Sequence, residues 1–313
     1  MSEPVCRCGA NHANSAGSSD SSAEDERVFE RIRGSSYERV YALSPLWAYA
    51  LAMIDTHCHL TFRDFAGRVP EVIERAERAG VSGMITISTT TSDCLDALAI
   101  AREYPNVWCT AGVHPLHADQ GPHVWDNLKR VATSGRCVAW GELGLDNHYS
   151  DPPRSVQDAV LAEQLAFIER CRGEGVDLPI VLHCREAFGE LIPVLRDAGV
   201  DPARCVFHCF TGGPAEARMV LDFGGWISFT GVVTYKNAPE VREAARLVPD
   251  DRIMVETDAP FLSPDPKRGV RPCEPWMTSL TATRLAEVRG QEFDVFHRLV
   301  NENTNRFFGV RTD

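Results

Sequence analysis

The chain contains 313 residues, of which 44% are hydrophobic and 24% are charged, and its formal net charge is −12. This composition is that of a globular protein with enough apolar residues for a large core, and no run of roughly eighteen apolar residues predicts a membrane-spanning helix. The negative charge argues against a protein that coats nucleic acid nonspecifically, because such binding needs a basic face, so any contact with phosphate groups should be local.

The beginning of the chain differs from the rest. Residues 1–52 are predicted to be a largely disordered N-terminal extension, because the stretch 15–23 consists of small and polar residues that bury little surface. Since Met53 directly precedes the first strong strand, we expect the fold not to need this extension. Cys6, Cys8 and His12 within it are compatible with either a metal site or a flexible leader. The eleven cysteines are scattered along the chain, which predicts reduced thiols and a cytoplasmic protein.

From residue 53 onward, short β-branched apolar runs alternate with longer stretches of helical spacing. The predicted strands are 53–59, 83–89, 107–114, 137–146, 179–185, 205–210, 226–231 and 253–258. The predicted helices are about 70–79, 92–103, 122–133, 155–172, 187–197, 214–222, 238–247, 276–289 and 292–307. Eight strand and helix repeats predict an α/β fold in which 53–313 closes into a (β/α)8 barrel of the TIM type. A doubly wound open sheet is the alternative.

Most of the predicted strands end in residues that can do chemistry. In such a barrel the reactive side chains stand at the carboxyl ends of the strands. The candidates there are His57, His59, His114, Glu142, His183, Arg185, His208 and Asp258. Because successive side chains of a strand alternate between its faces, His57 and His59 should both face the barrel interior. The thiols of Cys58, Cys184 and Cys209 should then face the helices.

The candidate metal ligands are nitrogen and oxygen donors. They are His57, His59, Glu142, His183, His208 and Asp258, a set that suits Zn²⁺, Mn²⁺ or Mg²⁺. Six protein ligands suit two divalent ions that share a bridging group, an arrangement that recurs in hydrolases. Ligand identity alone leaves open whether one ion or two is bound. His114 and Arg185 are also compatible with ordinary packing or loop roles.

Several phrases occur together in an informative order. They are "DTHCHL", "AGVHP", "GELGLD", "PIVLHCREA", "HCFTG" and "ETDAPFLSP". In this order and spacing the chain after residue 53 resembles the TatD family of metal-dependent deoxyribonucleases, within the amidohydrolase-like superfamily. The resemblance implies a distorted (β/α)8 barrel and metal-dependent hydrolysis of DNA phosphodiester bonds.

The resemblance also implies a role for each matching residue. His57, His59 and Asp258 would hold one divalent ion. His183 and His208 would hold a second ion, and Glu142 would bridge the two. Asp258 and Glu142 are then the catalytic candidates, with Asp258 orienting or deprotonating the attacking water. The expected phosphate-binding residues are His114, Arg185 and Arg268. Glu256 is expected to contact the metal ligands without binding a metal itself.

The loop after the last predicted strand departs from the family pattern. The family commonly has R-G-x-x-N-x-P, whereas this chain reads RGVRPCEP from Arg268 and lacks the asparagine. Lys267, Arg268 and Arg271 either form a local basic group that attracts phosphates or belong to an ordinary solvated loop. The sequence therefore does not decide whether this loop contacts the substrate.

Three functions fit these residues. The leading one is a divalent-metal-dependent deoxyribonuclease that acts as an exonuclease on single-stranded ends. The second keeps the metal site but cleaves an ester or amide, as in a D-aminoacyl-tRNA deacylase. The third is a noncatalytic metal-binding scaffold. DNA is the expected partner, and neither a membrane nor an obligate protein partner is expected.

Overall fold

The computed structural model describes residues 53–311. The predicted N-terminal extension, with Cys6, Cys8 and His12, lies outside the described residues, so its disorder and its dispensability stay predictions. Within residues 53–311, no helix has both the length and the apolar character needed to cross a membrane.

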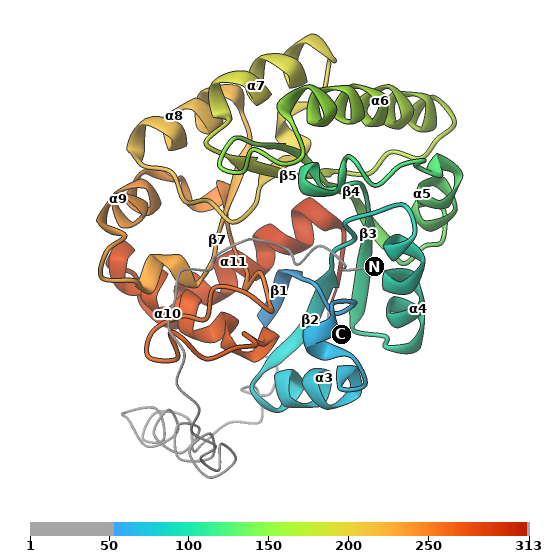
Figure 1. Cartoon of the computed structure of the whole chain (residues 1–313). Coiled ribbons are helices and arrows are strands. Elements are labelled where there is room, and N and C mark those ends of the chain that lie inside the picture. Colours follow the sequence, from blue (N-terminus) through green and yellow to red (C-terminus); the bar gives the residue numbers. More distant parts are fainter. Residues whose placement is uncertain (1–52, 312–313) are drawn as a thin grey trace.

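Eight parallel strands form one barrel in the described residues (Figure 1). They are β1 (Met53–Cys58), β2 (Val81–Thr86), β3 (Val107–Ala111), β4 (Cys137–Asp146), β5 (Ile180–Arg185), β6 (Cys205–Phe207), β7 (Trp226–Phe229) and β8 (Ile253–Val255). Each strand pairs with the next in chain order. The sheet closes where Cys58 bridges Ala259 and the His59 amide donates to the Ala259 carbonyl at 2.7 Å. The predicted (β/α)8 barrel is confirmed, and the open sheet is wrong.

Helices surround this barrel (Figure 1). They are α3 (Val69–Arg78), α4 (Asp93–Glu103), α5 (Trp125–Ala132), α6 (Arg154–Gly173), α7 (Phe188–Asp197), α8 (Pro214–Phe223), α9 (Pro239–Leu247), α10 (Thr278–Arg289) and α11 (Phe293–Phe308). Every predicted helix and strand is present, with ends that differ by at most about three residues from the predicted ones. Most strands end earlier than predicted, so His59, His114, His208 and Asp258 lie in the loops just beyond them.

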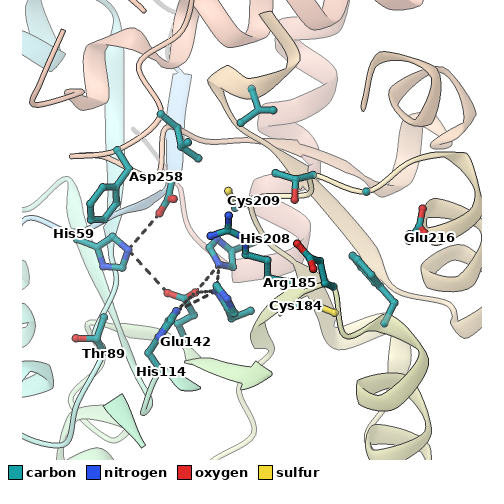
Figure 2. Close-up of a pocket in the computed structure, with 18 of the residues that line it drawn as sticks. His59, Thr89, His114, Glu142, Cys184, Arg185, His208, Cys209, Glu216 and Asp258 are labelled. Atoms are coloured by element: carbon teal, nitrogen blue, oxygen red, sulfur yellow. Dashed lines mark hydrogen bonds and ion pairs between the residues drawn. The ribbon is translucent and has the colours of Figure 1, made fainter. Parts of the chain in front are cut away.

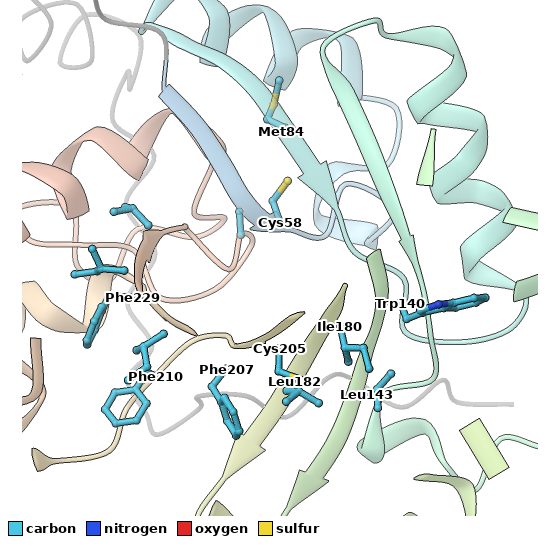
Figure 3. Packing of buried hydrophobic residues seen from close by; sticks show 14 of the residues in the cluster. Cys58, Met84, Trp140, Leu143, Ile180, Leu182, Cys205, Phe207, Phe210 and Phe229 are labelled. Atoms are coloured by element: carbon cyan, nitrogen blue, oxygen red, sulfur yellow. The ribbon is translucent and has the colours of Figure 1, made fainter. Parts of the chain in front are cut away.

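The strands separate two apolar layers. The outer layer packs the strands against the helices and includes Trp140, Leu182 and Phe207 (Figure 3). The inner layer fills the barrel near the amino ends of the strands and consists of Ile54, Ile85, Ile87, Trp108, Val138, Ala139, Val181, Val206, Trp226, Met254, Phe307, Phe308 and Val310. Phe307 and Phe308 come from the end of α11, so this helix closes the barrel at the amino ends of the strands, which we call the lower end. Polar side chains occupy the interior at the carboxyl ends of the strands, which we call the upper end.

An irregularity in β1 turns a histidine into the barrel. Asp55 pairs with Met84 and Cys58 pairs with Thr86, so β1 has one residue more than β2 in this interval. Strict alternation from the inward-facing Ile54 would have put residue 57 on the outer face. A β-bulge of this kind re-aims the side chains that follow it. As a result His57 faces the interior, and the thiol of Cys58 packs in the outer layer as predicted.

The same device operates in β4. The four residues of β4 from Trp140 to Leu143 lie opposite the three residues of β5 from Ile180 to Leu182. Trp140 and Leu143 therefore both pack in the outer layer, and Glu142 between them faces the interior. The pairing of β5 with β6 has no such shift, and Val181 packs in the inner layer, so His183 faces inward by simple alternation.

Candidate metal centre

The six candidate ligands converge at the upper end of the barrel (Figure 2). The structure brings together His57, His59, Glu142, His183, His208 and Asp258. The exposed fraction of each of these side chains is between 0% and 10%. Buried polar groups at this density are costly unless they are paired or bind a metal.

The first group of donor atoms comes from β1 and from the segment after β8. His57 Nε2 and His59 Nε2 lie 3.3 Å apart. Asp258 Oδ1 lies 3.6 Å from the first of these nitrogens and 3.4 Å from the second. Two neutral imidazole nitrogens cannot satisfy each other with lone pairs alone, so a proton or a cation belongs between them. Two imidazoles and a carboxylate oxygen match a divalent-cation site.

The second group surrounds Glu142. Glu142 Oε1 lies 2.9 Å from His183 Nδ1 and 2.5 Å from His208 Nε2, and these two nitrogens are 3.4 Å apart. The other oxygen, Oε2, lies 3.4 Å from His57 Nε2 and is buried without a hydrogen-bond partner in the described part of the chain. Glu142 thus turns one oxygen toward each group, as a bridging carboxylate would.

His114 also lies beside these groups, but it presents a hydrogen-bond donor to them. Its Nε2 is 3.3 Å from Glu142 Oε1 and 3.1 Å from His183 Nδ1. Its Nδ1 accepts a hydrogen bond from the Leu116 amide at 3.0 Å, so the proton of the neutral ring is on Nε2. Burial lowers the pKa of His114 to about 3, which keeps the ring neutral near pH 7. His114 therefore offers the centre an N–H donor instead of a lone pair.

The two buried carboxylates stay ionised. Burial alone would raise the pKa of Glu142, but His208, His114 and His57 together hold that pKa well below its usual value. Burial also opposes ionisation of Asp258, but its hydrogen bond with His59 and the charge interactions with His57, His59 and His208 together lower its pKa. Both acids are therefore negative at neutral pH, as oxygen ligands of a divalent cation must be.

Asp146, at the end of β4, was not predicted as a site residue. Its Oδ2 accepts a hydrogen bond from His183 Nε2 at 2.9 Å, and its Oδ1 accepts from the amides of His148 and Tyr149 at 2.9 and 3.1 Å. The amide hydrogen bonds fix the carboxylate, and the carboxylate fixes the ring so that Nδ1 faces Glu142. The signal in the sequence was an acidic residue at a strand end, the last letter of GELGLD.

Two further buried acids support the centre. Glu256 Oε1 lies 3.4 Å from His208 Nδ1 and accepts from the Cys209 amide at 2.6 Å, a placement that fits its expected supporting role. Asp55 was not predicted. It accepts hydrogen bonds from the amides of His57 and Thr257 at 3.3 and 2.9 Å, and so it ties β1 to the segment that carries Asp258.

The centre opens into a pocket of about 710 Å³. His59, His114, Glu142, His183, His208 and Asp258 line it, together with Arg185. Four non-glycine residues in the described part of the chain have a positive φ, namely Glu186, Cys209, Asp258 and Leu262, and all four line this pocket. Backbone conformations of this kind are unfavourable and concentrate at functional sites.

The pocket corrects one prediction about the thiols. Cys184 and Cys209 are half-buried and line the pocket. Cys184 also packs against the outer layer, as expected for a thiol that faces the helices, whereas Cys209 departs from that expectation. Cys209 follows the last residue of β6 by two positions and has a φ of 45°, so strand alternation no longer applies to it. Figure 2 shows both residues beside the pocket.

The three expected phosphate-binding residues are not placed alike. His114 and Arg185 line the pocket. Arg268 does not line it, and its guanidinium instead lies over the ring of Tyr235, 4.1 Å from the ring centroid. Arg271 lies over Phe261 in the same way at 4.9 Å, and its Nε is 3.2 Å from Asp64 Oδ1. The structure does not bring Arg268 to the centre.

The residues present fit divalent cations. The donors are imidazole nitrogens and carboxylate oxygens, and no thiol belongs to the ligand groups found among residues 53–311. Such a set suits zinc, manganese and magnesium better than soft metals. The buried Oε2 of Glu142, without a hydrogen-bond partner among these residues, is an acceptor that a cation would satisfy.

Comparison with known proteins agrees with this chemistry. The sequence model of the family described as TatD related DNase matches residues 54–309. A protein named 3'-5' ssDNA/RNA exonuclease TatD, from Erwinia tasmaniensis, is 36% identical over 82% of this chain and 100% of its own length. An uncharacterized metal-dependent hydrolase, YcfH of Escherichia coli K12, is 34% identical over 82% of this chain and 96% of its own length.

Solved structures show the same architecture. The crystal structure of YJJV, a TatD homologue from Escherichia coli K12, has a TM-score of 0.77 at 29% identity, covering 84% of this chain and 100% of that one. A TatD family hydrolase from Entamoeba histolytica has a TM-score of 0.74 at 22% identity, covering 82% and 98% of the two chains, and so supports the fold. This chain therefore belongs to the TatD-related DNase family of metal-dependent hydrolases.

Proposed function

We propose that this chain cleaves DNA phosphodiester bonds from single-stranded ends, with divalent metal ions as cofactors. The observation that carries the proposal is the Glu142 carboxylate, which lies between two groups of imidazole and carboxylate donors at the mouth of the barrel. Relatives named as single-strand exonucleases support the choice of substrate. The described cysteines form no disulfide, which supports a cytoplasmic location.

Two ions are proposed. His57, His59 and Asp258 would hold the first. His183 and His208 would hold the second, and Glu142 would bridge them. Bound divalent ions polarise a phosphoryl oxygen, offset its charge and activate water for attack.

The remaining groups would act on the substrate directly. Asp258 turns Oδ1 toward the two histidines of β1, and its Oδ2 is the atom proposed to orient the attacking water and take its proton. His114 would donate from Nε2–H to a phosphoryl oxygen as negative charge develops there. Arg185 would contribute a positive charge at the same pocket wall.

Product mapping tests the proposal. The purified full-length chain, supplied with Mn²⁺, Mg²⁺ or Zn²⁺, is incubated with 5'-labelled single-stranded DNA and, in parallel, with carboxylic ester and aminoacyl-tRNA substrates. We expect a ladder of DNA products that shorten one nucleotide at a time, and loss of turnover after chelation. Hydrolysis of the ester substrates with intact DNA would favour the deacylase, and bound metal without any turnover would favour a scaffold.

Glu142→Gln tests the shared bridge. The amide keeps the shape of the side chain but loses the negative charge, so both ions should be held more weakly. Elemental analysis after dialysis should show the metal content falling at both positions together. Loss of one ion with full retention of the other would contradict the bridge.

A further inference from the structure

The pocket is larger than the metal centre. Beyond the ligands it extends between the segments that follow β5, β6, β7 and β8. We call this part the side lobe, and its lining residues are Phe188, Gly189, Glu216, Met219, Val232 and Leu262. Figure 2 shows Glu216 on the side of the pocket away from His59, with Arg185 and Cys184 between them in this view.

The walls of the side lobe are mostly apolar. Phe188 is 7% exposed, and its ring centroid lies 5.5 Å from that of Phe210, so the ring is held by the outer layer. Met219 is 37% exposed and forms the open edge of the lobe. Neither a metal ion nor a phosphate group would be held by such walls. Such walls would hold a flat apolar ring, because aromatic and thioether side chains pack well against π systems.

Glu216 presents a carboxylate to this space. Glu216 lies in the first turn of α8, and its Oε2 accepts a hydrogen bond from the Gly213 amide at 2.9 Å. That bond caps the helix and fixes the carboxylate. Oε1 has no protein hydrogen-bond partner among residues 53–311. The side lobe thus offers a fixed acceptor beside apolar walls, which is a pattern that suits a ring with a donor on its edge.

We propose that the side lobe binds the base of the nucleotide at the end of the DNA strand. The base would lie against Phe188 and Met219, and its exocyclic amino group would donate a hydrogen bond to Glu216 Oε1. Adenine, cytosine and guanine carry such an amino group, and thymine does not. The inference rests on the proposed nuclease function, and it explains why a strand end would suit this pocket, since an end base is free to leave its neighbours.

The closing experiment varies only the terminal base. Single-stranded oligonucleotides end in adenine, in purine without the amino group, in thymine or in an abasic site, and kcat/KM for removal of the last nucleotide is measured with Mn²⁺. We expect adenine to exceed purine by about tenfold, the effect of one hydrogen bond to a charged group. The abasic end should be the slowest.

Glu216→Gln gives the sharper result. Glutamine can still accept the Gly213 amide through its Oε1, which leaves its amide N–H₂ as a donor toward the base. The preference for adenine over purine should disappear, and thymine, which presents a carbonyl oxygen, should improve relative to adenine. Asp222→Asn, the same change on an exposed residue of α8, should leave the preference intact. Met219→Ala should reduce the advantage of any base over the abasic end.

Two failures are distinguishable. If all four ends are removed at one rate, or if Glu216→Gln keeps the adenine preference, the side lobe does not read the base, and the nuclease function stands. If no DNA is hydrolysed with any metal, the proposed function is wrong, and the base-binding role falls with it.

Discussion

The two ends of the barrel interior are built by the same strands, and their contents are opposite. Near the amino ends of the strands, apolar side chains and the last turn of α11 fill the space. Near the carboxyl ends, buried imidazoles and carboxylates face one another. Burying apolar surface stabilises the fold by roughly 25 cal/mol per Å², whereas burying polar groups costs free energy unless they are satisfied. The lower end therefore stabilises the protein, and the upper end holds the residues proposed to carry its chemistry.

The largest effect is expected at the upper end. Asp258→Asn removes the charge of a proposed metal ligand and the oxygen proposed to take the proton of water, so kcat for DNA hydrolysis should fall by about 10²–10⁴-fold. The metal-free protein should still fold, with some loss of unfolding free energy, because the buried pairing of the Asp258 carboxylate with His59 is weakened. Steady-state kinetics and denaturant unfolding measure the two quantities. Near-normal activity would contradict the role of Asp258.

The converse change is made at the lower end. Phe308 is 6% exposed and packs with Phe307, their ring centroids 4.8 Å apart. Phe308→Ala should lower the unfolding free energy by about 3–5 kcal/mol. Metal content and kcat of the folded fraction should be unchanged, and Val295→Ala, on an exposed part of α11, should change neither stability nor activity. A selective loss of metal in Phe308→Ala would show that the two ends are not separable.

A smaller effect at the upper end tests how a ligand is oriented. In Asp146→Asn the side-chain carbonyl oxygen can still accept the hydrogen bonds from the amides of His148 and Tyr149. The new N–H₂ group then faces His183 Nε2. The ring would then carry its proton on Nδ1, the atom that faces Glu142. Metal affinity should fall by about 10–100-fold.

Two readouts check this orientation. Competition with a chromophoric chelator measures the affinity, and nitrogen chemical shifts of the metal-free protein report the tautomer of His183. Asp158→Asn, a carboxylate-to-amide change on the exposed face of α6, is the matched control. An unchanged tautomer and affinity in Asp146→Asn would contradict the orienting role.

The smallest effect concerns pH. His297, a buried residue of α11, has a pKa lowered by burial below the ordinary value of 6.5. The unfolded chain binds its proton more tightly than the folded chain, so stability is lost as the pH falls below about 6.5. His297→Gln should flatten the decline of unfolding free energy on acidification in that range. An identical pH dependence in both proteins would show that His297 does not contribute.

The sequence predicts most of this contrast, because both the helical spacing and the polar strand ends are local patterns. It could not predict the bulges. Strict alternation would place Trp140 and Glu142 on one face of β4, and only the pairing with β5 shows that an extra residue separates them. The sequence also overestimates the lengths of β6 and β8, because the residues that follow each strand continue the mixture of apolar and polar side chains found in the strand itself.

Supporting contacts were harder still to predict. Asp146 and Asp55 act through partners 37 and 202 residues away, so their roles follow from the closed barrel and not from their neighbours in the chain. Arg268 shows the opposite error. It carries the right charge in the right loop, but its guanidinium lies over Tyr235 instead of reaching the pocket.

The central claim is that side chains from separate strands hold two cations on either side of Glu142. A crystal of the full-length chain grown with Mn²⁺ tests it most directly, through the anomalous difference map at the upper end of the barrel. We predict two peaks, one beside His57, His59 and Asp258 and one beside His183 and His208, with Glu142 contacting both. A map without peaks there, with these side chains turned away from one another, would contradict the account.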